Sequence, residues 1–123
     1  MNGNDIVIVS ATRTAIGKFG GQFATTSAIE LGTAVAKSAI QKAKLSPDQI
    51  DTVIFGNVLQ AGLGQNPARQ VGLQAGLLHS STALTVNEVC GSGLKAIILA
   101  AQSLRLGDAK IVLAGGMENM SLA

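Results

Sequence analysis

Apolar residues recur along this chain with two different periods. Short runs rich in β-branched residues predict strands at 6–9, 52–55, 83–86 and 110–114. Between these runs, apolar or small residues return every three or four positions, which predicts helices at 28–43, 66–76 and 93–106. The alternation of strand and helix predicts an α/β domain with a mainly parallel sheet.

Polar residues mark where these helices begin and end. Ser27 and Glu30 form an S-x-x-E capping box, in which each side chain accepts a hydrogen bond from the other residue's backbone N–H. Ser46 followed by Pro47 is a second start signal, and it predicts a single helical turn. Gly107 predicts the end of the last helix.

Two elements are expected to be unusually well buried. The runs 6–9 and 52–55 are continuously apolar, which is typical of strands that are covered on both faces. The last helix is apolar almost all round, interrupted only by Lys95, Gln102, Ser103 and Arg105. A helix with so narrow a polar stripe is predicted to lie buried between layers rather than on a surface.

Composition excludes several classes of function. The chain has 123 residues and a net charge of +2, with no run of basic residues, so neither nucleic acid nor a membrane surface is an expected partner. One cysteine and one histidine allow no internal disulfide and no multi-histidine metal site. Residues 1–5 lack the features of a secretory signal, and the longest apolar run, 96–101, is too short to span a bilayer. We expect a soluble cytoplasmic protein.

Cys90 is the leading candidate for chemistry. It lies where a strand gives way to the start of the apolar helix, in the glycine-rich sequence Cys90-Gly91-Ser92-Gly93. Unpaired N–H groups and the positive end of the helix dipole favour a thiolate there, and the same N–H groups can hold an oxyanion. The two glycines leave room for a substrate or a neighbouring backbone. The alternative is that Cys90 is a small buried apolar residue with a structural role.

Three further features have competing interpretations. His79 would have to fold back along a whole strand to serve Cys90 as a base, so a solvent-exposed loop histidine is favoured. Gly62 and Gly64 precede a helix as in a phosphate loop, but the rest of such motifs is missing and a structural turn is favoured. Glu118 is either a charged loop tip or a buried partner.

The residues around Cys90 resemble the nucleophile motif of thiolases. The similar segments follow in the family's order over nearly the whole chain, at 8–14, 56–70, 87–96 and 114–121. The Val89-Cys90-Gly91-Ser92-Gly93 form is closer to biosynthetic acetyl-CoA acetyltransferases than to degradative thiolases. The resemblance implies that residues 1–123 are an incomplete N-terminal thiolase domain, part of an α/β/α/β/α fold whose central layer includes the helix after Cys90.

The resemblance also implies a reaction. Cys90 would accept the acetyl group of acetyl-CoA as a thioester, and a second acetyl-CoA would attack it to give acetoacetyl-CoA and CoA. The Cys90 N–H would supply half of an oxyanion hole. Coenzyme A thioesters are substrates in this scheme, so no separate cofactor and no metal are expected. The alternative activities are those of a longer-chain 3-ketoacyl-CoA thiolase or a ketoacyl synthase relative.

The family's activating histidine and second cysteine have no counterpart in this chain. The resemblance places both in the later half of the fold, so residues 1–123 are expected to be inactive alone. Family members are dimers or tetramers, and self-association is therefore expected. The alternative from another functional class is that the chain is a non-catalytic dimerisation or scaffold segment in which Cys90 has a structural role.

Overall fold

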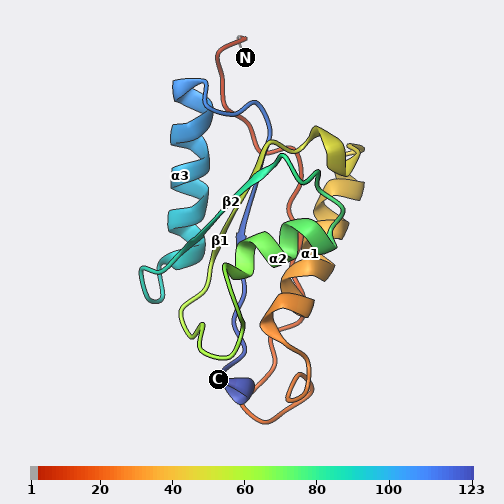
Figure 1. Cartoon of the computed structure of the whole chain (residues 1–123), viewed down its shortest axis with the longest axis vertical. Coiled ribbons are helices and arrows are strands. Elements are labelled where there is room, and N and C mark those ends of the chain that lie inside the picture. Colours follow the sequence, from red (N-terminus) through yellow and green to blue (C-terminus); the bar gives the residue numbers. More distant parts are fainter. Residues whose placement is uncertain (1–2) are drawn as a thin grey trace.

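A computed structural model describes residues 3–123. Met1 and Asn2 lie outside the described residues. Two predictions include them: the domain 1–123, and the absence of a secretory signal at residues 1–5. In chain order the elements are α1 (Ala28–Lys42), the 3-10 turn η1 (Pro47–Gln49), β1 (Thr52–Gly56), α2 (Pro67–Gln74), β2 (Thr82–Val86), α3 (Ser92–Leu106), β3 (Val112–Gly116) and the 3-10 turn η2 (Met120–Leu122) (Figure 1).

The three strands form one parallel sheet in the order β2-β1-β3, which confirms the predicted α/β class. Thr52 at the start of β1 pairs with Thr82 and Val112, and Gly56 at its end pairs with Val86 and Gly116. All three strands therefore begin at one end of the sheet and finish at the other. Loops that follow the strands meet at the carboxyl end.

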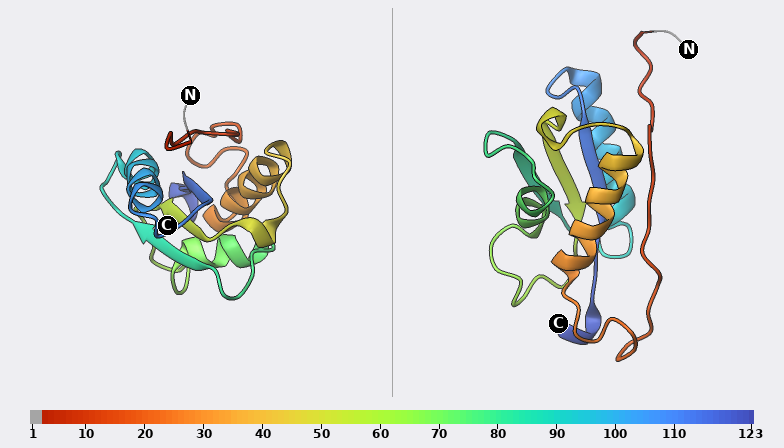
Figure 2. Two further views of the ribbon diagram at one scale, coloured as in Figure 1. Left: turned by 90° about the horizontal axis from the view of Figure 1, so that it is seen from above. Right: turned by 90° about the vertical axis from the view of Figure 1, so that its right-hand side faces the viewer.

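Helices cover the two faces of the sheet unequally. Helices α1 and α2 pack on one face and α3 on the other, giving three layers (Figure 2). The central strand contributes to both cores, because successive side chains point to opposite faces. Val53 and Phe55 lie in the core under α1 and α2, and Ile54 lies under α3 with Ala96 and Ala100.

The predicted capping box is confirmed at the start of α1. Ser27 Oγ accepts a hydrogen bond from the Glu30 N–H at 3.0 Å, and Glu30 Oε2 accepts one from the Ser27 N–H at 2.7 Å. The hydrogen bond from the Ser27 backbone lowers the pKa of the Glu30 carboxyl, since it stabilises the charged form. The single turn after Ser46 is also present, as η1.

The predicted strand at residues 6–9 is wrong for the chain described here. This segment runs extended beside α1, and it is held by Ser10 Oγ, which donates to Ala39 O at 2.7 Å, and by Thr12 Oγ1, which donates to Val35 O at 3.0 Å (Figure 2). A groove of about 1800 Å³ separates it from β3. A strand needs a hydrogen-bonded neighbour, and across this groove residues 6–9 have none.

The predicted burial of α3 between two layers is met on one side only in the described residues. Only one side of the helix touches the sheet, through Ala96 and Ala100, while Leu94 is 65% exposed and Leu106 is 78% exposed. The segment Val89–Leu106 is long and apolar enough to cross a membrane, by length and composition alone. The sequence prediction considered only the uninterrupted apolar run 96–101, whereas Val89–Leu106 also contains Lys95 and Arg105. Core helices of soluble proteins meet it too.

Candidate active site

Cys90 is exposed, in the turn that connects β2 to α3. The turn lies at the carboxyl end of the sheet, where ligands of parallel α/β folds bind. Val89, directly before the cysteine, has a φ of 53°, in the left-handed region that β-branched residues rarely adopt. Glu88 and Cys90 form an isolated β-bridge, at which the Gly91 N–H donates to Glu88 O at 3.1 Å. Within residues 3–123 no backbone hydrogen bond from the Cys90 N–H itself is found. Both the thiol and this N–H are therefore free to meet a substrate.

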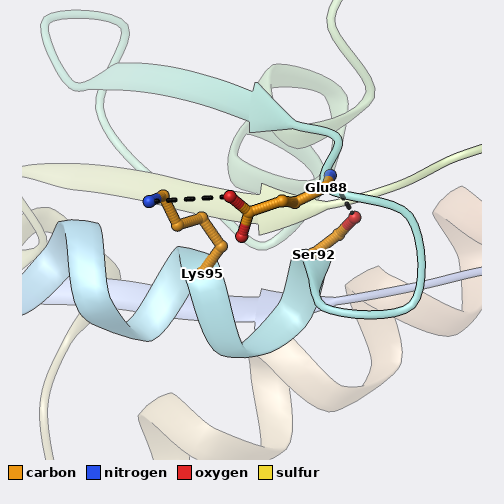
Figure 3. A network of polar contacts seen from close by, with 3 residues as sticks. All are labelled: Glu88, Ser92 and Lys95. Atoms are coloured by element: carbon orange, nitrogen blue, oxygen red, sulfur yellow. Dashed lines mark hydrogen bonds and ion pairs between the residues drawn. The ribbon is translucent and has the colours of Figure 1, made fainter.

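Ser92 holds this turn together from inside. Its side chain is buried, 4% exposed, and its Oγ accepts a hydrogen bond from the Glu88 N–H at 2.7 Å (Figure 3). The same hydroxyl donates to Val89 O at 2.6 Å. Around it, Lys95 Nζ lies 3.7 Å from Glu88 Oε1 in an exposed ion pair. Sequence reasoning treated Ser92 only as part of a motif and missed these two hydrogen bonds.

Two strand glycines let α3 begin directly against the sheet. A Cβ on Gly56 would lie 2.5 Å from the Ser92 carbonyl carbon, and one on Gly116 would lie 3.3 Å from Gly93 Cα. By contrast, a Cβ on Gly93 would meet open space, and one on Gly91 would be at an ordinary 3.5 Å from its nearest neighbour. The close backbone approach therefore depends on the strand glycines, while open space remains beside the motif glycines.

Glu118 is a structural partner rather than a free loop tip. Its carboxylate, in the loop after β3, accepts hydrogen bonds from the Val58 N–H at 3.0 Å, the Leu59 N–H at 3.3 Å and Asn57 Nδ2 at 3.1 Å. Asn57 is 1% exposed and also donates to Met117 O. These contacts join the loops that follow β1 and β3. The sequence alone did not distinguish this role from exposure.

His79 lies at the opposite end of the sheet from Cys90. It is exposed in the loop before β2, and its backbone carbonyl accepts a hydrogen bond from Arg69 Nη2 at 2.9 Å. A strand of five residues, the length of β2, separates the two ends by roughly 17 Å. The interpretation of His79 as a solvent-exposed loop residue is confirmed. It is not placed to act as a base for Cys90.

The glycine loop before α2 is a structural turn. Gly62 and Gly64 have φ values of 82° and 80°, which glycine adopts readily. The first N–H groups of α2, which a phosphate would need, are already used: the Ala68 N–H donates to Thr85 Oγ1 and the Arg69 N–H to Asn66 Oδ1. Nowhere in residues 3–123 do three or more His, Cys, Asp or Glu side chains group as metal ligands would.

Known proteins share the sequence and the fold of this chain. Residues 6–123 match the family model described as "Thiolase, N-terminal domain". The chain is 62% identical over 117 residues to acetyl-CoA acetyltransferase of Escherichia coli (strain K12), a match that covers 95% of this chain and 30% of that protein. The chain is also 55% identical over 118 residues to cytosolic acetyl-CoA acetyltransferase of Mus musculus. This match covers 96% of this chain and 30% of that protein.

A solved structure gives the same picture. The Acat5 thiolase from Ascaris suum, crystallised in complex with coenzyme A, superposes with a TM-score of 0.91 at 46% identity, covering 93% of this chain and 30% of that one. The chain thus spans about 30% of the length of the relatives it matches.

Proposed function

Because the chain belongs to the thiolase family, through that family's N-terminal domain, we propose that it carries the acyl-accepting nucleophile of an acetyl-CoA acetyltransferase. The observation that carries this proposal is Cys90 itself: an exposed thiol beside an unused backbone N–H, at the start of a helix and at the carboxyl end of a parallel sheet. The names of the relatives supply the substrate class, which is acetyl-CoA.

In the proposed first half-reaction the Cys90 thiolate attacks the thioester carbonyl of acetyl-CoA. The carbonyl oxygen becomes an oxyanion, which the Cys90 N–H stabilises, and the carbon–sulfur bond to CoA then breaks. The products are acetylated Cys90 and CoA, which takes up a proton. A thioester suits this step because its carbonyl remains electrophilic toward the next substrate.

In the second half-reaction another acetyl-CoA loses a proton from the carbon next to its carbonyl. The resulting carbanion attacks acetyl-Cys90, a carbon–carbon bond forms, and the bond to the Cys90 sulfur breaks. The products are acetoacetyl-CoA and the free thiolate. This step needs a base, and the one histidine of the chain is at the far end of the sheet. We therefore propose that residues outside 1–123 supply the base and the remaining oxyanion donors.

We further propose that the complete protein is cytoplasmic and forms dimers or tetramers with itself. The name of the mouse relative, which includes "cytosolic", supports the first statement. The exposed apolar side of α3, with Leu94, Ile97 and Ile98 each more than 40% exposed, fits a different proposal: in the complete protein, a layer from outside residues 1–123 covers this helix.

A chimera tests the proposed activity. In it, this chain replaces the matching region of the Escherichia coli relative. Incubation with acetyl-CoA should acetylate Cys90, as detected by peptide mass spectrometry, and should produce acetoacetyl-CoA. The matched Cys90→Ala chimera should do neither, and the 123-residue chain alone should form no acetoacetyl-CoA. Turnover by the Cys90→Ala chimera, or an inert Cys90 in the unsubstituted chimera, would show instead that Cys90 is structural.

A further inference from the structure

The peptide between Val89 and Cys90 has its direction fixed by Ser92. Val89 O accepts hydrogen bonds from both the Ser92 hydroxyl, at 2.6 Å, and the Ser92 N–H, at 3.2 Å. In a planar trans peptide the C=O and the following N–H point in opposite directions. Because Ser92 draws the Val89 carbonyl toward the start of α3, the Cys90 N–H points away from it.

This orientation is held against backbone strain. A β-branched residue in the left-handed region, as Val89 is with φ of 53°, is strained, and this conformation persists only where its surroundings impose it. Two side chains do so: Asn87 Oδ1 accepts from the Val89 N–H at 2.9 Å, and Ser92 holds the carbonyl. Without them, relaxation of Val89 would rotate the peptide and turn the Cys90 N–H.

Ser92 is well suited to this role because hydrogen bonds and packing fix the position of its side chain. Both functions of its hydroxyl are used, since Oγ also accepts from the Glu88 N–H at 2.7 Å. Its Cβ rests against the end of β1, where a Cβ on Gly56 would come within 2.7 Å. The hydroxyl thus connects the rigid end of the sheet to the peptide of the nucleophile.

We propose that Ser92 is a positioning residue for acyl transfer, whose hydroxyl keeps the Cys90 N–H turned toward the oxyanion. This inference rests on the proposed function. It assigns to Ser92 a task separate from thiol reactivity, because the hydrogen bonds of its hydroxyl go to Glu88 N–H and Val89 O, which set the direction of the Cys90 N–H. Loss of the hydroxyl should therefore impair only those reactions of Cys90 that pass through an oxyanion.

Two reactions of the same thiol separate these effects. Acetylation by acetyl-CoA passes through a tetrahedral oxyanion, whereas alkylation by iodoacetamide is a direct displacement at carbon and forms none. In the chimera, Ser92→Ala should lower the rate of Cys90 acetylation by about 10- to 100-fold, as expected when an oxyanion donor is misplaced. The alkylation rate should stay within about threefold. Ser92→Thr, which keeps the hydroxyl, should retain more of the acetylation rate than Ser92→Ala.

Matched variants exclude a general loss of folding. Ser103→Ala removes another serine of α3, far from the turn, and should change neither rate. Asn87→Ala removes the second support of the same peptide from an exposed position, and should lower acetylation selectively even if Ser92→Ala does not fold. Equal losses of acetylation and alkylation, or unchanged acetylation, would overturn the role of Ser92. An unsubstituted chimera that is not acetylated at Cys90 would overturn the proposed function as well.

Discussion

At each end of the sheet a carboxylate links the central strand to β3, but the two ends differ in the turns and glycines around them. At the amino end, Asp51 precedes β1 and its Oδ2 accepts from the Lys110 and Ile111 N–H groups, just before β3. At the carboxyl end, Glu118 follows β3 and accepts from the Val58 and Leu59 N–H groups, just after β1. At each end a carboxylate thus fastens the central strand to its neighbour.

The carboxyl end adds a β-branched residue with positive φ directly before the cysteine, and glycines that admit a helix. Gly56 and Gly116 bring the start of α3 against the strands, and Val89 with positive φ exposes Cys90. The amino end has its loop histidine, and the Arg69 guanidinium holds that loop through hydrogen bonds to Ser81 O and His79 O. We infer from this difference that the two carboxylates stabilise the sheet. The candidate site around Cys90 depends instead on the strand glycines, which have no side chain, and on the strained backbone at Val89.

Gly56→Ala should give the largest effect on stability. The added Cβ would lie 2.5 Å from the Ser92 carbonyl carbon, which is backbone and cannot yield easily. We expect a loss of about 3 kcal/mol in the free energy of unfolding, measured in urea. Gly93→Ala is the matched control, since its Cβ would meet open space in α3, and it should stabilise by about 0.5–1 kcal/mol. Equal effects of the two would contradict the close packing.

Glu118→Gln should cost less, about 2 kcal/mol at neutral pH. Three donors approach both carboxylate oxygens, so the amide nitrogen of glutamine would face at least one of them donor to donor. Urea unfolding of the variant measures the loss. Glu88→Gln, at a carboxylate that is exposed in an ion pair, is the control and should change stability by less than about 0.5 kcal/mol. Equal free energies of unfolding for Glu118→Gln and Glu88→Gln would mean that Glu118 does not hold together the loops after β1 and β3.

Asp51→Asn should cost about 1 kcal/mol, because exposure to solvent weakens its charge. Both backbone donors approach the same oxygen, Oδ2, so asparagine can keep both hydrogen bonds and loses only their charge assistance. Asp108→Asn, at the same end but without such donors in the described chain, should be neutral.

The pH dependence of stability gives a second measurement on Asp51. The Ile111 N–H, and after it the Lys110 N–H, lower the pKa of Asp51 below its ordinary value in unfolded chains, about 3.9. A depressed pKa in the folded state adds stability that is present above the unfolded pKa and is lost as pH falls through the folded value. The difference between the unsubstituted chain and Asp51→Asn should therefore shrink below about pH 4. A constant difference down to pH 2 would contradict this assignment.

Local signals in the sequence predicted much of this fold. The capping box of α1, the turn η1, three of the four strands and all three helices follow from periodicity and from end signals such as Ser27 and Gly107. Two burial predictions are not met in full by the described residues, for one reason. Residues 6–9 and the outer side of α3 are apolar enough for burial, but no described element covers them. Composition reports what a segment can bury, and not whether a neighbour is present.

The candidate site was only partly predictable for a different reason. Cys90 stands out by its motif and its position after a strand, and its proposed role still awaits the acetylation test. Some supporting contacts are not visible in the sequence because they join residues far apart in the chain: Glu118 reaches Val58, and Gly56 meets the backbone of Ser92. The hydrogen bonds of Ser92 are local, but they depend on the turn conformation, in which Val89 has a positive φ. Only the register of three parallel strands brings these residues together.

The smallest expected effect belongs to the ion pair beside the turn. Lys95 and Glu88 are 3.7 Å apart with side chains 38% and 59% exposed, and exposed pairs contribute less than about 0.5 kcal/mol. A double-mutant cycle with Lys95→Gln and Glu88→Gln should give a coupling of this size, decreasing in high salt. A coupling well above about 1 kcal/mol would show that surface charge orders the turn. A small coupling energy, together with a large effect of Ser92→Ala on acetylation, would show that the buried Ser92 hydroxyl orders the turn. The ion pair and the hydroxyl hold the same segment and differ mainly in their exposure to water.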